Sequence, residues 1–282
     1  MKILILGSNG MLGSTLYKYL KYKKNIHVLG TSRESKRIRG QDKNIILKFD
    51  VNFLKSLEKK IRTISPDIII NCIGIVKSEV IKHKSTYVYK INSKLPKFLN
   101  YISKKNNFKL IHISTDCVFS GLKKNYSEKH KPDPKDLYGK SKLNGEFSSR
   151  KNLVIRTSII GHEINNKRGL LEWFLKQKKD VYGYKNAYFS GLTTYEISKI
   201  IYNKILFNKK IFGLYHISGN KISKYKLLQK IKKIYKLKLN LIKENYFIID
   251  RSLDCSKFLK RTGYKKVNWN KMIKENKIFF QK

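Results

Sequence analysis

The stretch Ile3-Leu4-Ile5-Leu6-Gly7-Ser8-Asn9-Gly10-Met11-Leu12-Gly13 decides the fold of this chain. Four apolar residues run directly into glycines spaced three apart, and an amphipathic segment then continues to residue 20. Glycine allows a tight turn and a close backbone approach to phosphates. A glycine turn between a buried strand and a helix is a usual place for a dinucleotide pyrophosphate. The spacing G-x-x-G-x-x-G differs from G-x-G-x-x-G, and an ordinary turn is the alternative. We expect the cofactor to contact Gly7, Asn9, Gly10, Met11 and Gly13.

Short apolar runs alternate with amphipathic stretches through the first half of the chain. The predicted strands are 3–6, 26–30, 45–49, 68–72, 110–114 and 153–156. The predicted helices are 11–20, 53–64, 87–104 and 137–150. Continuous apolar strands alternating with helices indicate a parallel sheet covered on both faces. We therefore predict an α/β fold, with a Rossmann-type doubly wound sheet formed by residues 1–160.

The second half, residues 161–282, is less regular and predicts a smaller C-terminal α/β substrate-binding region. Its predicted helices are 169–178, 193–207, 223–235 and 270–280. Thr193 and Ser223 are good helix caps. A strand near 213–217 is expected to interleave this region with the first domain.

The end of the second strand usually selects the cofactor in such folds. An acidic residue there would accept the ribose 2′-hydroxyl of NAD, but this chain has Thr31-Ser32-Arg33. Arg33 is placed to meet a 2′-phosphate, which favours NADP; NAD and a merely solvated arginine are the alternatives. Ser32 is also expected to contact the cofactor. Asp50 and Val51 follow the third strand. Asp50 is expected to contact the adenine amino group or to cap a helix.

Tyr138 and Lys142 stand one helical turn apart, so they share a helix face. A neighbouring ammonium lowers the pKa of a phenol and suits it to exchange a proton with a carbinol or carbonyl. The pattern is weak alone, because Tyr17 and Lys21 have the same spacing. Ser114-Thr115-Asp116, at the end of an apolar run, strengthens it.

Together these segments resemble the extended short-chain dehydrogenases/reductases. The resemblance implies that Thr115 hydrogen-bonds the substrate carbonyl, Tyr138 delivers the proton and Lys142 holds the nicotinamide ribose. It also implies that Asn92 supports a proton relay at the substrate. The turn containing Asn71, Cys72 and Gly74 would lie beneath the cofactor.

Within that family the chain is similar to the dTDP-4-dehydrorhamnose reductases and related sugar-nucleotide enzymes. The segments that carry this likeness are 66–71, 114–116, 118–119, 137–139, 141–142, 156–158 and 213–216. The resemblance implies NADPH-dependent reduction of a 4-keto deoxysugar nucleotide for surface polysaccharide. A UDP-sugar reductase or epimerase, and a non-catalytic subunit like the regulatory subunit of methionine adenosyltransferase, are the alternatives.

Two departures from that pattern concern the substrate. Ile159 stands where the rhamnose enzymes carry a tryptophan against the sugar. Cys117 stands where related dehydratases carry a glutamate, so dehydration lacks its base. Asp116 is expected to bind a sugar hydroxyl or to cap its loop.

Other conspicuous side chains have simpler interpretations. His112 and His216 are expected to be satisfied core residues. The aromatic residues Tyr182, Tyr184, Tyr188 and Phe189 are expected to line a hydrophobic core rather than a sugar pocket.

The 282 residues include 63 Lys+Arg and 19 Asp+Glu, a formal net charge of +44. Only nine of the basic residues are arginine, and nucleic-acid readers favour arginine, so no specific nucleic-acid partner is expected. Three scattered cysteines predict neither disulfides nor a metal site. With no apolar leader or membrane span, a cytoplasmic protein is expected. A homodimer is left open.

Overall fold

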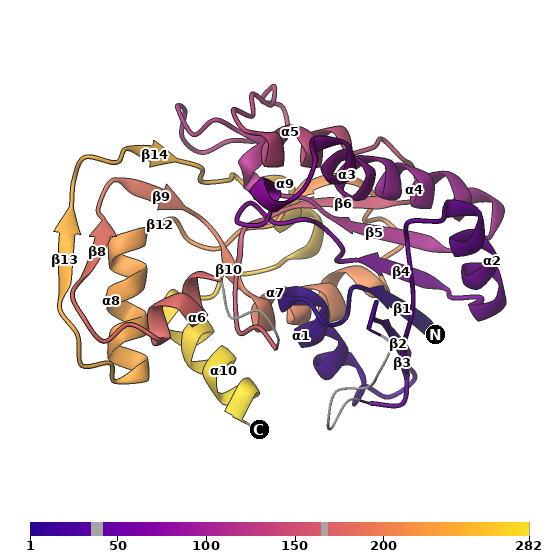
Figure 1. The fold of residues 1–282 in the computed structure, drawn as a ribbon, viewed down its shortest axis with the longest axis horizontal. Helices are drawn as coiled ribbons and strands as arrows, with labels where there is room; N and C mark the ends of the chain where they lie inside the picture. The colour runs from indigo at the N-terminus through magenta and orange to yellow at the C-terminus, as the bar shows by residue number, and fades with distance from the viewer. Residues whose placement is uncertain (35–41, 165–168, 282) are drawn as a thin grey trace.

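The computed structural model describes residues 1–34, 42–164 and 169–281. Its centre is a parallel sheet in the order β11-β6-β5-β4-β1-β2-β3 (Figure 1). The strands are β1 Lys2–Leu6, β2 His27–Thr31, β3 Ile45–Ile46, β4 Ile68–Asn71, β5 Lys109–Ile113, β6 Leu153–Arg156 and β11 Gly213–His216. The strand order reverses direction between β1 and β4, the point at which such sheets bind ligands. The predicted Rossmann-type fold is confirmed.

The sheet is buried on both faces because β1 supplies apolar side chains to each. Ile3 and Ile5 belong to one core cluster, and Leu4 and Leu6 belong to another, since successive side chains of a strand point to opposite faces. The first cluster includes residues of α1 (Met11–Leu20) and α7 (Thr194–Ile200), and the second includes residues of α2 (Leu54–Ile64) and α4 (Leu95–Lys105). In Figure 1, α3 (Ser85–Tyr89) and α5 (Leu137–Asn144) lie on the α4 side of the sheet.

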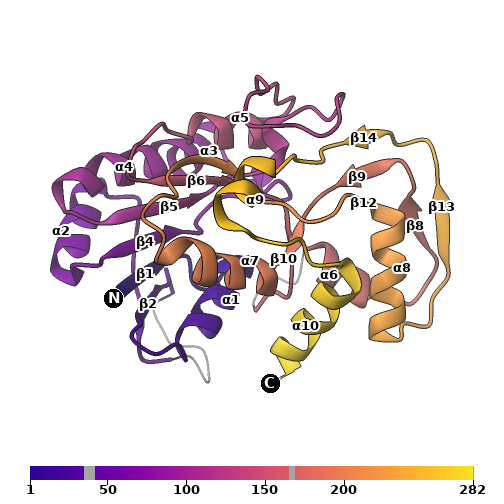
Figure 2. The same ribbon diagram turned by 180° about the vertical axis from the view of Figure 1, so that it is seen from behind.

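The C-terminal region lies beside the sheet and contains three small sheets, β10-β7, β12-β9-β14 and β13-β8 (Figure 2). The strands are β7 Ile159–Ile160, β8 Val181–Tyr184, β9 Ala187–Phe189, β10 Leu192–Thr193, β12 Ile222–Ser223, β13 Leu241–Glu244 and β14 Ile249–Asp250. The helices are α6 Leu170–Leu175, α8 Lys224–Tyr235, α9 Ser256–Thr262 and α10 Trp269–Gln281. These strands are all two to four residues long, too short to show a hydrophobic period. Neither the strands nor α9 were predicted.

The second half returns to the main sheet. β11 pairs with β6, and α7 packs against α1, so residues beyond 160 complete the main sheet and one of its helical layers. The domain division at residue 160 stays a prediction.

Several predicted boundaries are wrong. β3 stops at Ile46, and Lys48 takes a positive φ of 50° that no strand tolerates. The predicted helix 87–104 divides into α3, a π-helical segment over Lys90–Lys94, and α4. α5 ends at Asn144 instead of residue 150. The cap predictions are confirmed: Thr193 accepts from the Glu196 amide, and Ser223 accepts from the Lys226 amide.

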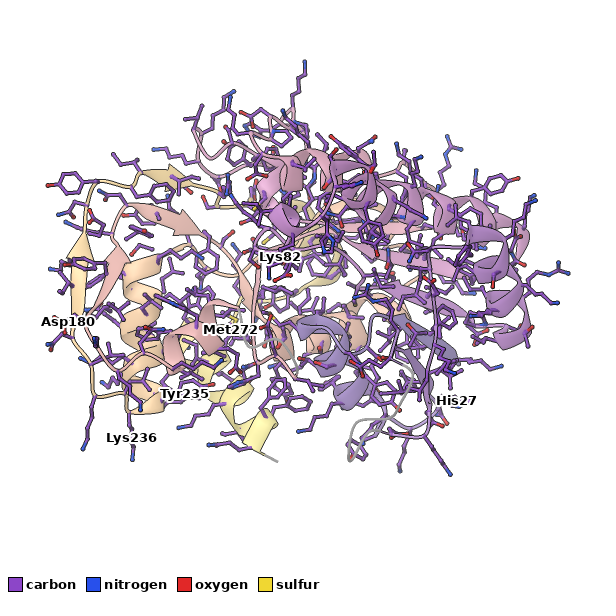
Figure 3. The ribbon with its side chains drawn as sticks, in the orientation of Figure 1. His27, Lys82, Asp180, Tyr235, Lys236 and Met272 are labelled. Carbon is purple, nitrogen blue, oxygen red and sulfur yellow. The ribbon has the colours of Figure 1, made fainter. Side chains whose placement is uncertain are left out.

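The positive charge is spread over the molecule. Figure 3 shows nitrogen-tipped side chains projecting from every edge of the view, including Lys236 at the end of α8. None of the helices in the described ranges is both long and apolar enough to cross a bilayer.

Candidate functional site

The turn after β1 brings the amino end of α1 to the switch point. Gly7 has a φ of +81°, a conformation that favours glycine. A Cβ on Gly13 would lie 2.1 Å from the Gly7 carbonyl oxygen, so α1 crosses the turn with no room for a side chain. Gly10 is the N-cap, and no acidic residue lies in the first turn of α1. These features fit a pyrophosphate, because backbone N–H groups and a positive helix end face it.

Side chains at the end of β2 hold this turn in place. The Gly7 amide donates to Thr31 Oγ1 at 3.1 Å, and Asn9 Nδ2 donates to Ser32 Oγ at 2.8 Å. Arg33 follows with its side chain exposed. The structure therefore brings Gly7, Asn9 and Ser32 together and leaves Arg33 open to solvent beside them.

Asp50 and Val51 follow the short β3. Val51 is buried, and Asp50 Oδ1 accepts a hydrogen bond from the Asn52 amide at 2.8 Å. The alternative that Asp50 caps a helix is wrong, because the N-cap of α2 is Phe53 and no side chain caps that helix. The expected contact of Asp50 and Val51 with adenine stays a prediction.

The segment after β4 closes the other side of the switch point. Asn71 Oδ1 accepts from the Ile73 amide at 3.1 Å, which shapes the turn. A Cβ on Gly74 would lie 3.7 Å from Lys142 Nζ, so this glycine backbone covers the lysine. Burial raises the pKa of the Cys72 thiol to about 12, despite the opposing charge of Lys142, and the thiol stays protonated at neutral pH.

Asn92 links that segment to α5 from within the π-helical segment. Its Oδ1 accepts from the Ile75 amide at 2.8 Å, and its Nδ2 donates to the Ile75 carbonyl at 3.0 Å and to Ser141 Oγ at 3.0 Å. Both amide hydrogens are therefore used within the protein. Gly145 ends α5 where an added Cβ would lie 2.0 Å from the Asn92 carbonyl oxygen. Asn92 therefore ties the segment after β4 to α5. Its expected contact with substrate stays a prediction.

Thr115, Tyr138 and Lys142 come together at the carboxyl end of β5. The Tyr138 phenol lies beside Thr115, and Lys142 Nζ donates to the Ile113 carbonyl at 2.7 Å. Burial raises the Tyr138 pKa above that of free tyrosine; the charges of Cys117 and Asp116 add to the effect, and the nearby Thr115 hydroxyl opposes it. The expected lowering of the phenol pKa is therefore wrong for the ligand-free protein, because desolvation outweighs any nearby cation.

The Lys142 ammonium is itself perturbed. Burial lowers its pKa to about 8, while the charges of Glu146 and Cys72 oppose that change. Glu146 lies under the end of β5: its Oε1 accepts from Ser114 Oγ at 2.6 Å and from Arg156 Nε at 2.9 Å. The sequence analysis missed Glu146, although it follows Lys142 by one helical turn of spacing.

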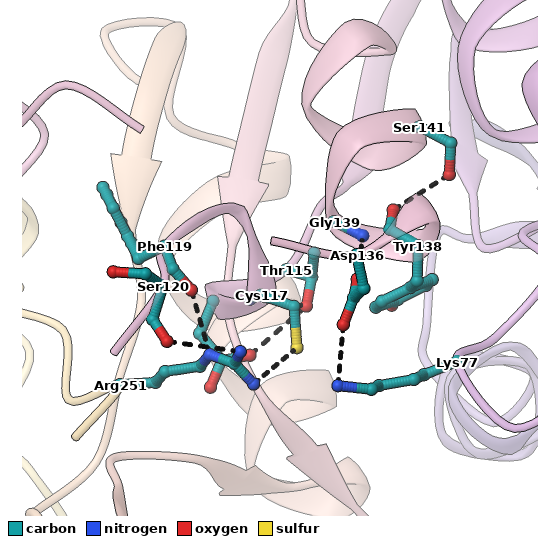
Figure 4. A network of polar contacts seen from close by, with 11 residues as sticks. Lys77, Thr115, Cys117, Phe119, Ser120, Asp136, Tyr138, Gly139, Ser141 and Arg251 are labelled. Carbon is teal, nitrogen blue, oxygen red and sulfur yellow. Dashed lines mark hydrogen bonds and ion pairs between the residues drawn. The ribbon is translucent and has the colours of Figure 1, made fainter. Parts of the chain in front are cut away.

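The turn after Thr115 collects further polar groups (Figure 4). Thr115 Oγ1 accepts from the Cys117 amide at 3.1 Å and donates to Asp116 Oδ1 at 3.2 Å. Thr115 is the cap of this turn, so the alternative that Asp116 caps it is wrong. Arg251 reaches the turn from beyond β14, with Nη1 3.7 Å from Cys117 Sγ. No local motif marked Arg251, because 134 residues separate it from Cys117.

Opposite Arg251, Lys77 pairs with Asp136 at 2.7 Å. Asp136 also caps α5 by accepting from the Gly139 amide at 2.8 Å. A Cβ on Gly139 would lie 2.3 Å from the Cys117 carbonyl oxygen. This close approach presses the helix that carries Tyr138 against the Thr115 turn.

Of the remaining predictions, which concern Ile159 and the aromatic residues of β8 and β9, some are confirmed and others are wrong or untested. Ile159 is half-buried in β7 and pairs with Leu192 of β10; its expected contact with the sugar stays a prediction. Tyr182 and Tyr184 are 61% and 44% exposed, so their expected place in the core is wrong. The opposite face of β8, which carries Val181 and Gly183, is buried instead. Phe189 is in the core, as expected.

The two histidines differ. His216 Nδ1 lies 3.0 Å from the Tyr126 carbonyl oxygen, and His216 is a satisfied core residue as expected. His112 is buried with Nδ1 3.2 Å from Asn71 Nδ2, but its Nε2 has no hydrogen-bond partner within the described residues. The expectation of a fully satisfied His112 is therefore wrong.

Residues 1–276 match the RmlD substrate binding domain family. The chain belongs to this family. The dTDP-4-dehydrorhamnose reductase of Aggregatibacter actinomycetemcomitans is 27% identical over 228 residues, 77% of this chain and 73% of that protein. The methionine adenosyltransferase 2 subunit beta of Xenopus tropicalis is 31% identical over 153 residues, 51% of this chain. That match spans only 41% of the relative's own length.

Solved structures share the fold across the whole chain. The dTDP-4-dehydrorhamnose reductase of Bacillus anthracis, solved in complex with NADP, has a TM-score of 0.82 at 22% identity, covering 98% of each chain. The UDP-glucose 4-epimerase of Thermotoga maritima has a TM-score of 0.79 at 16% identity, covering 100% of this chain and 99% of its own. These likenesses confirm the fold of the extended short-chain dehydrogenases/reductases.

Proposed function

We propose that this protein reduces a 4-keto deoxysugar attached to a nucleoside diphosphate, with NADPH as reductant. One observation carries the proposal: Tyr138 and Thr115 lie beside the buried Lys142, next to the glycine turns at the switch point. The full-length family match and the similarity to a dTDP-4-dehydrorhamnose reductase over 77% of the chain support it.

The proposed cofactor site uses two sets of residues. Gly7, Gly10, Met11 and Gly13 would hold the pyrophosphate, and Lys142 would hold the nicotinamide ribose. The cofactor would supply a hydride to the sugar carbonyl carbon. Arg33 at the end of β2 supports NADP, since an exposed guanidinium suits a 2′-phosphate.

Tyr138 would donate its proton to the carbonyl oxygen as the alcohol forms. A phenol whose pKa is raised by burial is fully protonated at neutral pH. It therefore carries the proton that the reaction consumes. The Lys142 cation would stabilise the phenolate left behind. Thr115 now donates to Asp116, so its hydroxyl must rotate before it can donate to a substrate carbonyl.

The product would enter polysaccharide synthesis. A Bacillus subtilis relative named spore coat polysaccharide biosynthesis protein SpsK is 26% identical over 227 residues, 78% of this chain, which supports this assignment. The absence of a carboxylate at Cys117 supports reduction over dehydration.

A non-catalytic regulatory subunit is the second candidate. The similarity to methionine adenosyltransferase beta subunits over half the chain favours it. The intact set of Thr115, Tyr138 and Lys142 favours the reductase.

A screen of nucleotide sugars separates the candidates. The purified protein is mixed with dTDP- and UDP-linked 4-keto sugars and with NADPH or NADH, and absorbance at the reduced nicotinamide band is followed. Oxidation of NADPH with one sugar supports the reductase. Conversion of the sugar without net oxidation supports an epimerase. Tight NADPH binding without turnover of any sugar supports the regulatory subunit.

A further inference from the structure

Exposed apolar side chains gather at one end of the molecule, on the small sheet formed by β8 and β13. Within the described residues, seventeen large hydrophobic side chains are exposed, and six of them lie in β8 or in residues 241–248. These six are Tyr182, Tyr184, Ile242, Tyr246, Phe247 and Ile248, and we call them the β8–β13 patch. Folded proteins rarely gather exposed apolar side chains in one place without a binding role. The patch therefore indicates a docking surface.

The pairing of the two strands places part of the patch on one face. β8 and β13 run parallel, and Ile242 lies opposite Tyr182. A Cβ on Gly183 would lie 2.9 Å from Tyr225 Cδ2 of α8, so Gly183 faces that helix. Successive side chains of a strand point to opposite faces. Tyr182, Tyr184 and Ile242 therefore lie on the face turned away from α8, where they remain exposed.

The loop after β13 extends the patch beyond the sheet. Tyr246, Phe247 and Ile248 are exposed in succession, Tyr246 at 93% and Ile248 at 79%. The Phe247 ring lies 5.1 Å from the Tyr184 ring, which joins the loop to the sheet. Figures 1 and 2 show the chain between β13 and β14 running around an outer corner of the molecule. A projecting loop of this kind suits insertion into an apolar phase better than enclosure of a small ligand, which needs a concave site.

Lysines surround the patch. Residues 178–185 and 236–248 contain six lysines but only two acidic residues, and all six lysines are exposed. Figure 3 labels Asp180 and Lys236 at this end of the molecule. A lysine can lay its alkyl stem along apolar surface while its ammonium stays in water. Lysines beside an apolar surface are attracted to anionic lipid headgroups.

We propose that the β8–β13 patch and its lysines dock on the surface of a membrane that contains anionic lipids. The loop 246–248 would enter the headgroup region, and the lysines would stay at the level of the lipid phosphates. Tyrosine suits this depth because one end of its side chain is apolar and the other is polar. Neither residues 178–185 nor residues 236–248 contain arginine or tryptophan, which protein interfaces favour at their energetic centres. The composition therefore fits lipid better than a protein partner.

Co-sedimentation with vesicles tests the docking. The full chain is mixed with vesicles of phosphatidylcholine alone, or of phosphatidylcholine with phosphatidylglycerol, at low and at high salt. The net charge of +44 attracts the whole protein to anionic vesicles, but salt screens that attraction. We expect binding to the mixed vesicles that persists in part at high salt, because apolar contacts are not screened. Complete loss of binding at high salt would show attraction by charge alone and would overturn the docking.

Substitutions that keep every lysine separate the apolar contact from the charge. The triple variant Tyr246→Ser, Phe247→Ser, Ile248→Ser should lower the vesicle partition coefficient about tenfold or more at high salt, since binding scales with buried apolar area. The control Tyr22→Ser, Phe53→Ser, Ile81→Ser removes the same three residue types from exposed positions outside the patch. It should change the coefficient by less than about twofold.

A single substitution guards against a folding defect in the triple variant. Ile248→Glu places a carboxylate where the loop would enter lipid and should lower the partition coefficient about fivefold or more. Ile81→Glu makes the same chemical change at an exposed position outside the patch. It should lower the coefficient by less than about twofold. Equal losses in Ile248→Glu and Ile81→Glu would overturn the docking.

The remaining outcomes are equally decisive. Unchanged vesicle binding in the triple variant, or no vesicle binding by the unmodified protein, would overturn the docking. A dimer in analytical ultracentrifugation that the triple variant loses, with vesicle binding unaffected, would assign the patch to a second copy of the chain instead. The docking does not depend on the reaction, so a failed screen of nucleotide sugars leaves it standing.

Discussion

The glycine turn after β1 and the contacts of Arg251 with the turn after Thr115 flank the same strand ends, but they are assembled differently. The turn is made by neighbours in sequence and is fixed by close backbone packing. A Cβ added to Gly13 would lie only 2.1 Å from the Gly7 carbonyl oxygen. The Arg251 contacts join segments more than 100 residues apart. The difference teaches that the proposed cofactor side is set by local sterics, and the proposed substrate side by long-range packing and charge.

Gly13→Ala tests the steric half of this comparison and should have the largest effect on stability. Alanine is normally favoured in helices, but here its Cβ would collide with backbone. We expect a loss of about 3 kcal/mol in the free energy of unfolding, measured in urea. The control Gly10→Ala places its Cβ 3.4 Å from the same oxygen and should cost under about 1 kcal/mol. Equal losses in both variants would contradict the steric account.

Glu146→Gln tests how much the buried ion pair at the end of β5 contributes to stability. Arg156 and Glu146 form an ion pair at 2.7 Å with side chains 4% and 10% exposed. Removing one partner leaves a buried charge and should cost about 3 kcal/mol. The surface pair of Lys82 and Glu79 at 3.3 Å supplies the control Glu79→Gln, which should cost under about 0.5 kcal/mol.

The same variant, Glu146→Gln, should also change how NADP⁺ affinity depends on pH. The Lys142 pKa is about 8 in the folded protein and is ordinarily 10.5, so its ammonium is charged below pH 8 and neutral above. The affinity for NADP⁺ should fall as pH rises through that value. Glu146 raises the Lys142 pKa, and Glu146→Gln should move the fall to lower pH. An unshifted midpoint would show that Glu146 acts only in packing.

Arg33→Ser should have a smaller effect, confined to one cofactor. Loss of a charge-assisted bond to a 2′-phosphate should weaken NADPH binding about tenfold, or about 1.4 kcal/mol, and leave NADH binding unchanged. Arg62→Ser removes the same charge from an exposed position on α2 and serves as the control. Fluorescence titration with each cofactor gives both constants. Equal weakening of NADPH and NADH would refute a 2′-phosphate contact.

Tyr182→Ser should have the smallest effect. Its ring is 61% exposed on β8, so the free energy of unfolding should change by under about 0.5 kcal/mol. Phe189→Ala, in buried β9, should cost about 3 kcal/mol. A large loss from Tyr182→Ser would restore the original assignment of this tyrosine to the core.

The sequence sufficed for most of the main sheet because strands such as β1 and β4 are made largely of consecutive apolar residues. It also placed Tyr138 and Lys142 on one helix, because their spacing is local. It failed in the C-terminal region, where strands such as β12 and β14 are two residues long and exist only through pairing with β9. Arg251 and Glu146 were missed for the same reason, since tertiary contacts alone give them their places.

Hydride transfer in Tyr138→Phe tests the central claim most directly. The variant keeps the ring and loses the hydroxyl, so NADPH should bind within about threefold of the unmodified protein, while turnover of the sugar found in the screen falls about 10²- to 10⁴-fold. Turnover at the original rate, with NADPH bound, would show that the proton comes from another group and that the three side chains at the end of β5 do not form the reaction centre.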